Sequence, residues 1–253
     1  MPHIRLTALL LLGGLSIGSL AGCAGEHVTQ AGSEPHESFL CGGTPVSAEA
    51  VSERMPLSEL TGASQEALSG AKFDDGSPLN LEDATDWFVV EESNQSLTIL
   101  RDIEEANSAV AHTIHADHDK ITIAWVDAVN IEPGWLVAAT GSCALTLDLG
   151  DLSVPWITLD PENPIDPASR ELHLLVTEQS CSSGVDAAGR IKIVRIEENH
   201  DRVDLVIGVA PRSGGQDCPS SPATPFTLTL HEPIADRLIV NGSLRSERPL
   251  NGG

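Results

Sequence analysis

Residues 191–209, IKIVRIEENHDRVDLVIGV, decide the fold class of this chain. In the last part of the stretch apolar residues recur at every second position: Val203, Leu205, Ile207 and Val209. A period of two places these side chains on one face, so the pattern predicts a half-buried β-strand. Residues 191–196 form a second apolar run, and the polar residues 197–200 separate the two. The stretch therefore predicts an antiparallel hairpin.

Other runs of strand length flank this hairpin on both sides. They cover 172–176, 226–230 and 237–240 in the second half of the chain, and 39–41, 87–91, 96–100, 121–129, 135–140 and 144–149 in the first half. The polar residues 92–95 join two of these runs into a second expected hairpin. Sheet structure is therefore expected along most of the chain.

Helical patterns are short and confined to the first half. Ser47 and Ser64 are expected to cap two short helices on either side of Pro56. Asp102, with Glu105 three positions later, fits the start of a third helix. Many strand-length runs and few helices predict a mainly β (α+β) fold. We expect antiparallel sheets in a sandwich-like arrangement or an open barrel, with minor helices in the N-terminal half.

The segment 160–167, Asp-Pro-Glu-Asn-Pro-Ile-Asp-Pro, separates the two halves. Its three prolines exclude the interior of a helix or a central strand, because proline lacks a backbone N–H. It is therefore predicted to be a linker. The linker would join an α+β lobe, 39–159, to a β-rich lobe, 168–248.

The N-terminus has the pattern of a cleaved leader. Arg5 precedes the apolar residues 6–20, and small residues then lead into Cys23. A membrane-spanning helix would need about 20 apolar residues to cross roughly 30 Å of hydrocarbon. The segment 6–22 contains four glycines and two serines, which disfavours that alternative. We predict a signal peptide over 1–22, followed by a flexible polar tether over 23–38.

The cysteine count bears on the fate of Cys23. The chain has five cysteines, so an ordinary secreted form that kept Cys23 as a free thiol would have an odd number. Removing Cys23 leaves four that can pair completely: Cys41, Cys143, Cys181 and Cys218. Three connectivities are open, and we favour one bridge in each half, Cys41–Cys143 and Cys181–Cys218. No two cysteines have C-x₂₋₄-C spacing, which disfavours a zinc site and thiol–disulfide exchange.

Motifs at the N-terminus and from Pro133 onward carry a family resemblance. They are Leu20-Ala21-Gly22-Cys23, Gly134-Trp135, Gly141-x-Cys143, Trp156, Glu178-x-x-Cys181-x-x-Gly184, Cys218-Pro219, Pro222, Pro225, Pro233-Ile234-Ala235-Asp236-Arg237 and Asn241-Gly242. The first motif resembles the lipobox of bacterial lipoproteins, and the others resemble a group of uncharacterised actinobacterial lipoproteins. The resemblance implies lipidation of Cys23 and a location on the outer face of the cytoplasmic membrane. It implies no activity.

The net charge and the histidines limit the classes of ligand. A formal net charge of −23 disfavours nucleic acid, whose binding requires basic residues, and disfavours lying flat on an anionic leaflet. His112, His115 and His118, with Asp117 and Asp119, form the one cluster that suggests metal binding. The alternative is a solvated helix end, which we favour over a metal site.

No familiar catalytic motif is present. G-x-S-x-G and H-E-x-x-H are both absent from the sequence. Glu178 and Asp236-Arg237 are expected to make structural ionic contacts. The four tryptophans could line a glycan or lipid groove, but they are expected to fill the core: Trp87, Trp125, Trp135 and Trp156.

These observations predict a lipid-anchored extracytoplasmic protein that is not an enzyme and needs no metal or other cofactor. Its expected role is that of a binding or interaction module of the cell envelope, with a protein or small-molecule ligand. The alternative is a metal-binding protein or an envelope hydrolase that uses His112, His115 and His118.

Overall fold

The computed structural model describes residues 38–103, 114–129 and 132–251. The predicted signal peptide, Cys23 and all but the last residue of the tether lie outside these residues. The helix expected after Asp102 also lies outside them, apart from its first residues. Contacts group the described residues into a single unit, His36–Gly253.

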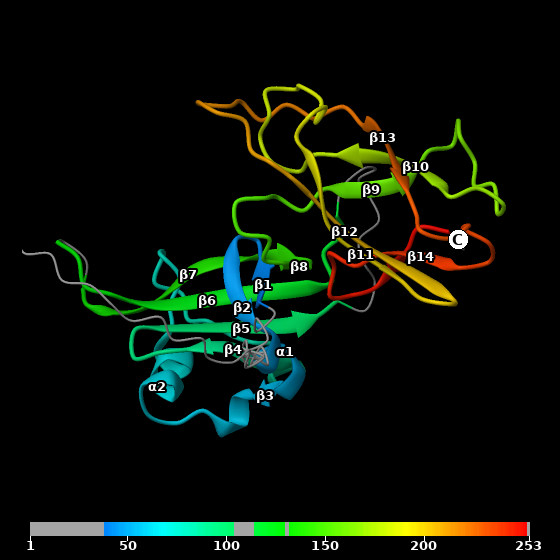
Figure 1. The fold of residues 1–253 in the computed structure, drawn as a ribbon. Helices are drawn as coiled ribbons and strands as arrows, with labels where there is room; N and C mark the ends of the chain where they lie inside the picture. The colour runs from blue at the N-terminus through cyan, green and yellow to red at the C-terminus, as the bar shows by residue number, and fades with distance from the viewer. Residues whose placement is uncertain (1–37, 104–113, 130–131, 252–253) are drawn as a thin grey trace, which may run out of the picture. The chain divides into compact units, whose positions relative to one another are not determined.

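The first half of the chain forms two antiparallel sheets (Figure 1). The larger has the order β3-β4-β5-β6-β7, with β3 (Met55–Pro56), β4 (Trp87–Glu92), β5 (Ser96–Asp102), β6 (His118–Val126) and β7 (Gly134–Cys143). The smaller has the order β2-β1-β8, with β1 (Ser38–Cys41), β2 (Thr44–Ser47) and β8 (Leu145–Leu147). The expected hairpin across residues 92–95 is confirmed as β4–β5.

The second half forms two further sheets. One has the order β13-β10-β9, with β9 (Trp156–Leu159), β10 (Glu171–Thr177) and β13 (Thr224–Thr229). The other has the order β11-β12-β14-β15, with β11 (Ile191–Glu198), β12 (Arg202–Val209), β14 (Leu238–Asn241) and β15 (Arg248–Pro249). The hairpin predicted from residues 191–209 is confirmed as β11–β12.

The two C-terminal sheets pack face to face around one hydrophobic core. Leu172, Leu174 and Val176 of β10 share this core with the alternating residues of β12, and all are at most 1% exposed. The mainly β, sandwich-like fold expected from the sequence is therefore confirmed. One pairing differs from the expectation, because β14 lies parallel to β12. Alternation shows which face of a strand is buried, but it does not specify the direction of a partner distant in sequence.

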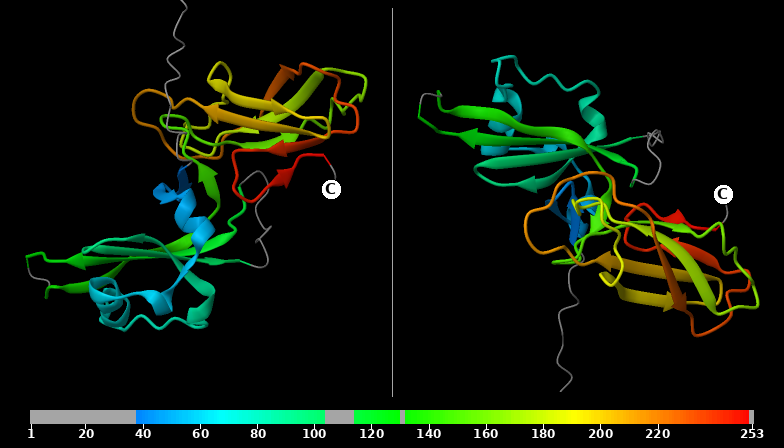
Figure 2. Two further views of the ribbon diagram at one scale, coloured as in Figure 1. Left: turned by 60° about the horizontal axis from the view of Figure 1, so that its bottom comes forward. Right: turned by 90° about the horizontal axis from the view of Figure 1, so that it is seen from above.

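The five-stranded sheet is covered on both faces (Figure 2). Helix α2 (Gly62–Gly70), together with the 3₁₀ turns η1 (Leu57–Glu59) and η2 (Ala84–Asp86), lies on the face that carries Trp87, Leu97 and Ile99. Helix α1 (Ala48–Glu53) and strands β1 and β2 cover Phe88 and Leu100 on the other face. The β6–β7 hairpin extends beyond the other strands of the sheet.

The helix caps agree with the sequence only in part. Ser47 caps α1, as expected, because its Oγ accepts a hydrogen bond from Ala50 N at 3.0 Å. The prediction that Ser64 caps the next helix is wrong. That helix begins at Gly62, and the buried Ser64 hydroxyl instead donates to Glu92 Oε1 at 2.7 Å. A tertiary contact to β4 has replaced the local role.

Residues 160–167 connect β9 to β10, and these two strands pair in one antiparallel sheet. Within the segment, the Asp160 carboxylate accepts bonds from Asn163 Nδ2 at 2.8 Å and Glu162 N at 3.0 Å. These hydrogen bonds hold the pKa of Asp160 below its ordinary value. Because β9 pairs with β10, the strand that precedes the segment belongs to the C-terminal sheets.

Gly208 of β12 lies under the connection between β8 and β9. A Cβ at this position would come within 2.8 Å of Leu152 Cβ and 3.3 Å of Leu149 Cδ1. Gly208→Ala is therefore expected to lower the free energy of unfolding by about 1–3 kcal/mol through overpacking, measured by urea denaturation. Gly141→Ala in β7 is the matched control, because no atom lies within 4 Å of its Cβ position. Equal stability of the two variants would contradict this account.

Candidate functional site

The histidines singled out by the sequence have separate surroundings. His112 lies outside the described residues. The His115 ring packs edge-on against Trp156, with ring centroids 5.5 Å apart, whereas the His118 ring packs against Phe88 at 6.3 Å. Within the described part of the chain, no group of three His, Cys, Asp or Glu side chains is placed to hold a metal ion.

His118 lies between two carboxylates in the interior of the first half. Its Nδ1 is 2.6 Å from Asp117 Oδ1, and its Nε2 is 3.2 Å from Asp102 Oδ1. Arg54 in turn donates to both oxygens of Asp102, at 3.1 and 2.8 Å. His118 is 6% exposed, whereas the Arg54 and Asp102 side chains are 42% and 55% exposed, and this row of contacts links β5, β6 and the end of α1.

The environment of Asp117 affects its protonation. Burial alone would raise the pKa of Asp117, but hydrogen bonds from His118 and Ser246 hold it below the ordinary value. A lowered pKa stabilises the folded state above the ordinary pKa of an aspartate, and this stabilisation is lost as the pH falls. The geometry and this direction both indicate a structural ion pair.

Both favoured disulfides are present, which confirms the predicted pairing. Cys41–Cys143 has a Cα–Cα distance of 5.3 Å and joins β1 to the end of β7. Cys181–Cys218 has a Cα–Cα distance of 4.4 Å and joins two loops of the second half. The first bridge is buried, with Cys41 0% and Cys143 6% exposed, whereas both cysteines of the second are exposed.

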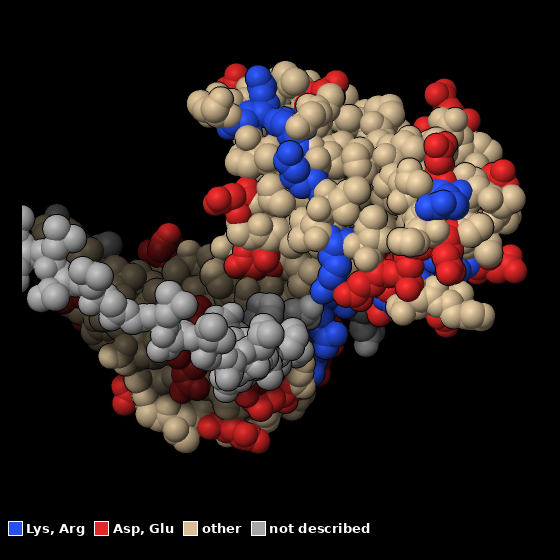
Figure 3. All heavy atoms as spheres, in the orientation of Figure 1, with Lys and Arg blue, Asp and Glu red and all other residues tan. Residues whose placement is uncertain are grey.

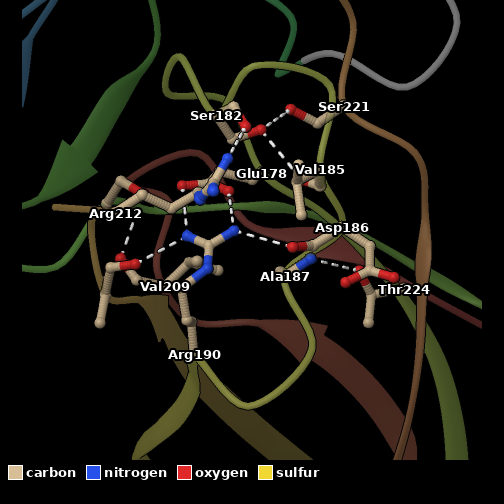
Figure 4. A network of polar contacts seen from close by, with 12 residues as sticks. Glu178, Ser182, Val185, Asp186, Ala187, Arg190, Val209, Arg212, Ser221 and Thr224 are labelled. Carbon is tan, nitrogen blue, oxygen red and sulfur yellow. Dashed lines mark hydrogen bonds and ion pairs between the residues drawn. The ribbon is translucent and has the colours of Figure 1, made fainter. Parts of the chain in front are cut away.

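The loops joined by the second bridge are held by a buried ion pair (Figure 4). The Arg190 guanidinium donates to both oxygens of Glu178, at 2.9 and 2.5 Å. It also donates to the carbonyl oxygens of Ala210 at 2.8 Å and Asp186 at 2.9 Å. The Glu178 side chain is 1% exposed, so all its charge is compensated inside the fold. Glu178 thus makes the structural ionic contact that the sequence suggested.

Arg237 makes a comparable contact in the second half of the chain, whereas Asp236 is exposed. The Arg237 guanidinium donates to Glu198 Oε2 at 2.9 Å and to the carbonyl oxygens of Glu232 and Pro233. Burial alone would raise the pKa of Glu198, but hydrogen bonds from His231 N, Arg237 and Glu232 N lower it. This cluster also connects secondary-structure elements, since it ties β11 to the β13–β14 connection.

The tryptophans do not all fill the core. Trp87 is 5% exposed, as expected for a core residue. The same expectation is wrong for Trp125, which is 43% exposed. Trp135 and Trp156 are half-buried. Trp125 lies directly opposite Trp135 in the β6–β7 ladder, with ring centroids 5.5 Å apart and planes at 76°.

A third aromatic residue lies beside this pair. Lys72 N donates to Trp135 O at 3.1 Å, and Val137 N donates to Lys72 O at 2.9 Å, so residue 72 extends the sheet next to β7. Lys72 pairs with Leu136 in a parallel bridge. Since side chains alternate along a strand, we infer that Phe73 lies on the face of Trp135 and Val137. Phe73 is 37% exposed.

We call Phe73, Trp125 and Trp135 the aromatic ridge. It continues the row of side chains that α2 covers further along the sheet: Trp135 packs partly against that core, and Gly70 at the end of α2 lies near it. A Cβ on Gly70 would be 3.8 Å from Trp135 Cδ1. The helix ends there, and Trp125, which lies opposite Trp135 on the next strand, is 43% exposed. The sequence shows the alternation that puts Trp125 on this face, but it does not show where α2 ends.

The surroundings of the ridge are acidic. Residues 71–78 and 125–135 contain four acidic residues and one basic residue, Lys72. The acidic residues are all exposed: Asp74, Asp75, Asp127 and Glu132. The Asp75 carboxylate accepts bonds from the Ser77 hydroxyl and backbone N–H, which lower the pKa of Asp75. On the face shown in Figure 3, most of the visible basic side chains lie over the C-terminal sheets, and acidic side chains are spread over both these sheets and the five-stranded sheet.

A concave surface lies beside the Cys41–Cys143 bridge. It is an open groove of about 500 Å³, and its lining comes from β1, β8 and the segments 142–144, 152–154 and 179–180. Among its described lining residues there is no charged or aromatic side chain. Ligand sites usually place a few specific polar groups within an apolar lining. The groove has such polar side chains, among them Ser142, Thr146 and Gln179, but it lacks the exposed aromatic face that the ridge offers.

Comparison with known proteins found no match, either to a protein family, to a curated protein or to a solved structure. The resemblance to actinobacterial lipoproteins therefore rests on the motif residues alone. In the described part of the chain, no helix combines the length and the apolar character needed to cross a membrane.

Proposed function

We propose that this protein is a lipid-anchored, non-enzymatic binding module of the cell envelope. A lipid on Cys23 would hold it at the outer face of the cytoplasmic membrane, and the aromatic ridge would contact its ligand. The pairing of cysteines is the observation that carries this proposal. Cys41 bonds to Cys143 and Cys181 to Cys218, so no described cysteine remains to pair with Cys23. A fifth cysteine directly behind a leader is then the one left for lipidation.

The buried charged groups support binding rather than catalysis. Glu178 pairs with Arg190 and Arg237 pairs with Glu198, while both ring nitrogens of His118 lie close to aspartate oxygens. Each of these contacts joins separate segments of the fold, as structural ion pairs do. Large exposed aromatic side chains, by contrast, are typical of surfaces that bind a partner. The ridge is therefore the surface on which the proposed role depends.

Lipidation can be tested directly on Cys23. Wild-type protein from a membrane extract is expected to carry at least two acyl chains on its first residue, and to partition into the detergent phase on phase separation. In the Cys23→Ser variant, a protease site inserted before residue 23 allows the leader to be cleaved off. The cleaved variant is expected to lack the added mass of the acyl chains and to stay out of the detergent phase. The reason is that two or more acyl chains buried in a membrane or micelle anchor a protein stably. Without acyl chains, the variant exposes only its acidic surface.

Intact mass spectrometry measures both forms, and Ser33→Ala in the tether is the matched control. A wild-type protein with an unmodified Cys23, or with its leader retained, would overturn the anchored location. The ridge would then still be a binding surface, because its geometry does not depend on the anchor.

A further inference from the structure

We propose that the aromatic ridge binds an uncharged polysaccharide, whose pyranose rings stack on the exposed indole of Trp125 while neighbouring carboxylates accept bonds from its hydroxyl groups. This inference rests on the proposed binding function, to which it adds the chemical class of the ligand. Three features of the ridge favour an uncharged polysaccharide as its ligand: its aromatic faces, its charge and its rigid support.

The aromatic faces are concentrated in a chain that has few of them. The whole protein has four tryptophans, four phenylalanines and no tyrosine. Trp125 and Trp135 pack against each other, and the pairing of Lys72 with Leu136 assigns Phe73 to the same face. Phe73 and Trp125 are each more than a third exposed. An indole face carries partial negative charge, so it attracts the weakly positive C–H groups on the face of a sugar ring. The Trp125 indole is 43% exposed and the Trp135 ring packs edge-on against it at 76°, so Trp125 offers one exposed face on which a sugar ring can stack.

The charge of the surroundings narrows the choice of polymer. Four exposed carboxylates and one ammonium group lie within three positions of a ridge residue in the sequence, and this acidic excess disfavours nucleic acids, anionic lipids and anionic polysaccharides. An ionised carboxylate only accepts hydrogen bonds, and hydroxyl groups are donors. An uncharged, hydroxyl-rich chain therefore complements both the aromatic faces and their acidic margin.

A protein partner fits these surroundings less well. The central parts of protein–protein interfaces contain few Asp and Glu residues, because burying them costs desolvation. Here Asp74 and Asp75 directly follow Phe73, and Asp127 is two residues from Trp125. A polysaccharide can leave these carboxylates in water while it bonds to them, whereas a close-packed protein surface would bury them.

The support of the ridge is rigid. Trp125 and Trp135 lie on paired strands, and backbone bonds to both sides of Lys72 attach the segment of Phe73 to β7. Trp125 N also donates to Gln95 O at 2.8 Å, next to the β4–β5 turn. A platform that is ordered before binding loses little conformational entropy when a ligand binds.

The test uses the full chain in detergent and neutral hexasaccharides of three kinds: β-1,4-linked glucose, β-1,4-linked N-acetylglucosamine and α-1,4-linked glucose. Tryptophan fluorescence and isothermal titration are expected to show binding of at least one. Trp125→Ala is expected to weaken this binding at least tenfold, and Trp125→Phe less. Ile193→Ala on β11, another exposed apolar residue, is the matched control and should bind as the wild type does. Urea denaturation of each variant establishes that it is folded.

Three outcomes would overturn the inference. They are the absence of binding to every hexasaccharide, binding that Trp125→Ala leaves unchanged, and ridge-dependent binding of another class. The last is measured with phosphatidylglycerol vesicles, for a membrane surface, and by analytical ultracentrifugation, for a second copy of the chain. Trp125-dependent association in either assay would support the proposed binding function but contradict a polysaccharide as its ligand. The absence of Trp125-dependent association in all assays would remove the ridge from the proposed function as well.

Discussion

Replacing Arg190 by alanine is expected to lower the free energy of unfolding by about 3–5 kcal/mol. The Arg190 side chain is 18% exposed and its partner Glu178 only 1%, so the variant leaves a buried carboxylate without its counter-charge. The same change removes the bonds from Arg190 to the carbonyl oxygens of Ala210 and Asp186. The measurement is urea denaturation followed by tryptophan fluorescence at neutral pH.

Two variants establish that the unpaired charge is the cause. Arg195→Ala removes an exposed ion pair with Glu197, whose side chains are 42% and 54% exposed, and is expected to cost less than about 1 kcal/mol. The double variant Glu178→Leu with Arg190→Met removes both charges, and is expected to recover much of the loss. If Arg190→Ala cost no more than Arg195→Ala, the pair would not be the structural contact described above.

Removing the Cys41–Cys143 bridge is expected to have a similar or larger effect. The bridge joins residues 102 positions apart, and on the chain-entropy model a closed loop of about 100 residues contributes about 4.7 kcal/mol. Cys41→Ala with Cys143→Ala should lower the free energy of unfolding by about 4–5 kcal/mol, measured by the same urea titration. Both cysteines are buried in one hydrophobic cluster, so packing is lost as well.

The second bridge is the control for loop length. Cys181–Cys218 spans 37 positions and lies at the surface, so its removal should cost less, about 3–4 kcal/mol. The reverse order of the two losses, or a loss below about 1 kcal/mol for the first pair, would contradict the entropic account.

Several expectations from the sequence were correct because they depend on local structure. The hairpins β4–β5 and β11–β12 follow from alternating apolar residues around short polar turns, and the Ser47 cap follows from one hydroxyl near the first turn of α1. The disulfide pairing followed from the division of the chain into halves. The hairpins and the cap are determined over a few residues, whereas the disulfide pairing was chosen among three connectivities by placing one bridge in each half.

The candidate site was predictable only in part. Trp125 and Trp135 were visible as candidates for a groove, but a core role was expected for both. Phe73 was missed, because a single phenylalanine beside a turn resembles any other loop residue. Its signal is the hydrogen bonding of Lys72 to β7, which is a contact between segments more than 60 positions apart. The histidine segment was visible in the sequence as a candidate metal site, but the structure separates its residues. His115 packs against Trp156, whereas His118 packs against Phe88.

The sequence by itself determined most of the longer strands, though not β2, β3, β9 and β15, together with the buried face of the alternating strands and the number of cysteines available for bridges. These depend on the two-residue period of the backbone and on composition. The tertiary structure decided which buried faces are covered along their whole length. Leu152 closes over Gly208, whereas α2 ends at Gly70 and leaves Trp125 exposed. The reason is that a strand pattern shows which side chains share a face, while the cover over that face comes from segments distant in sequence.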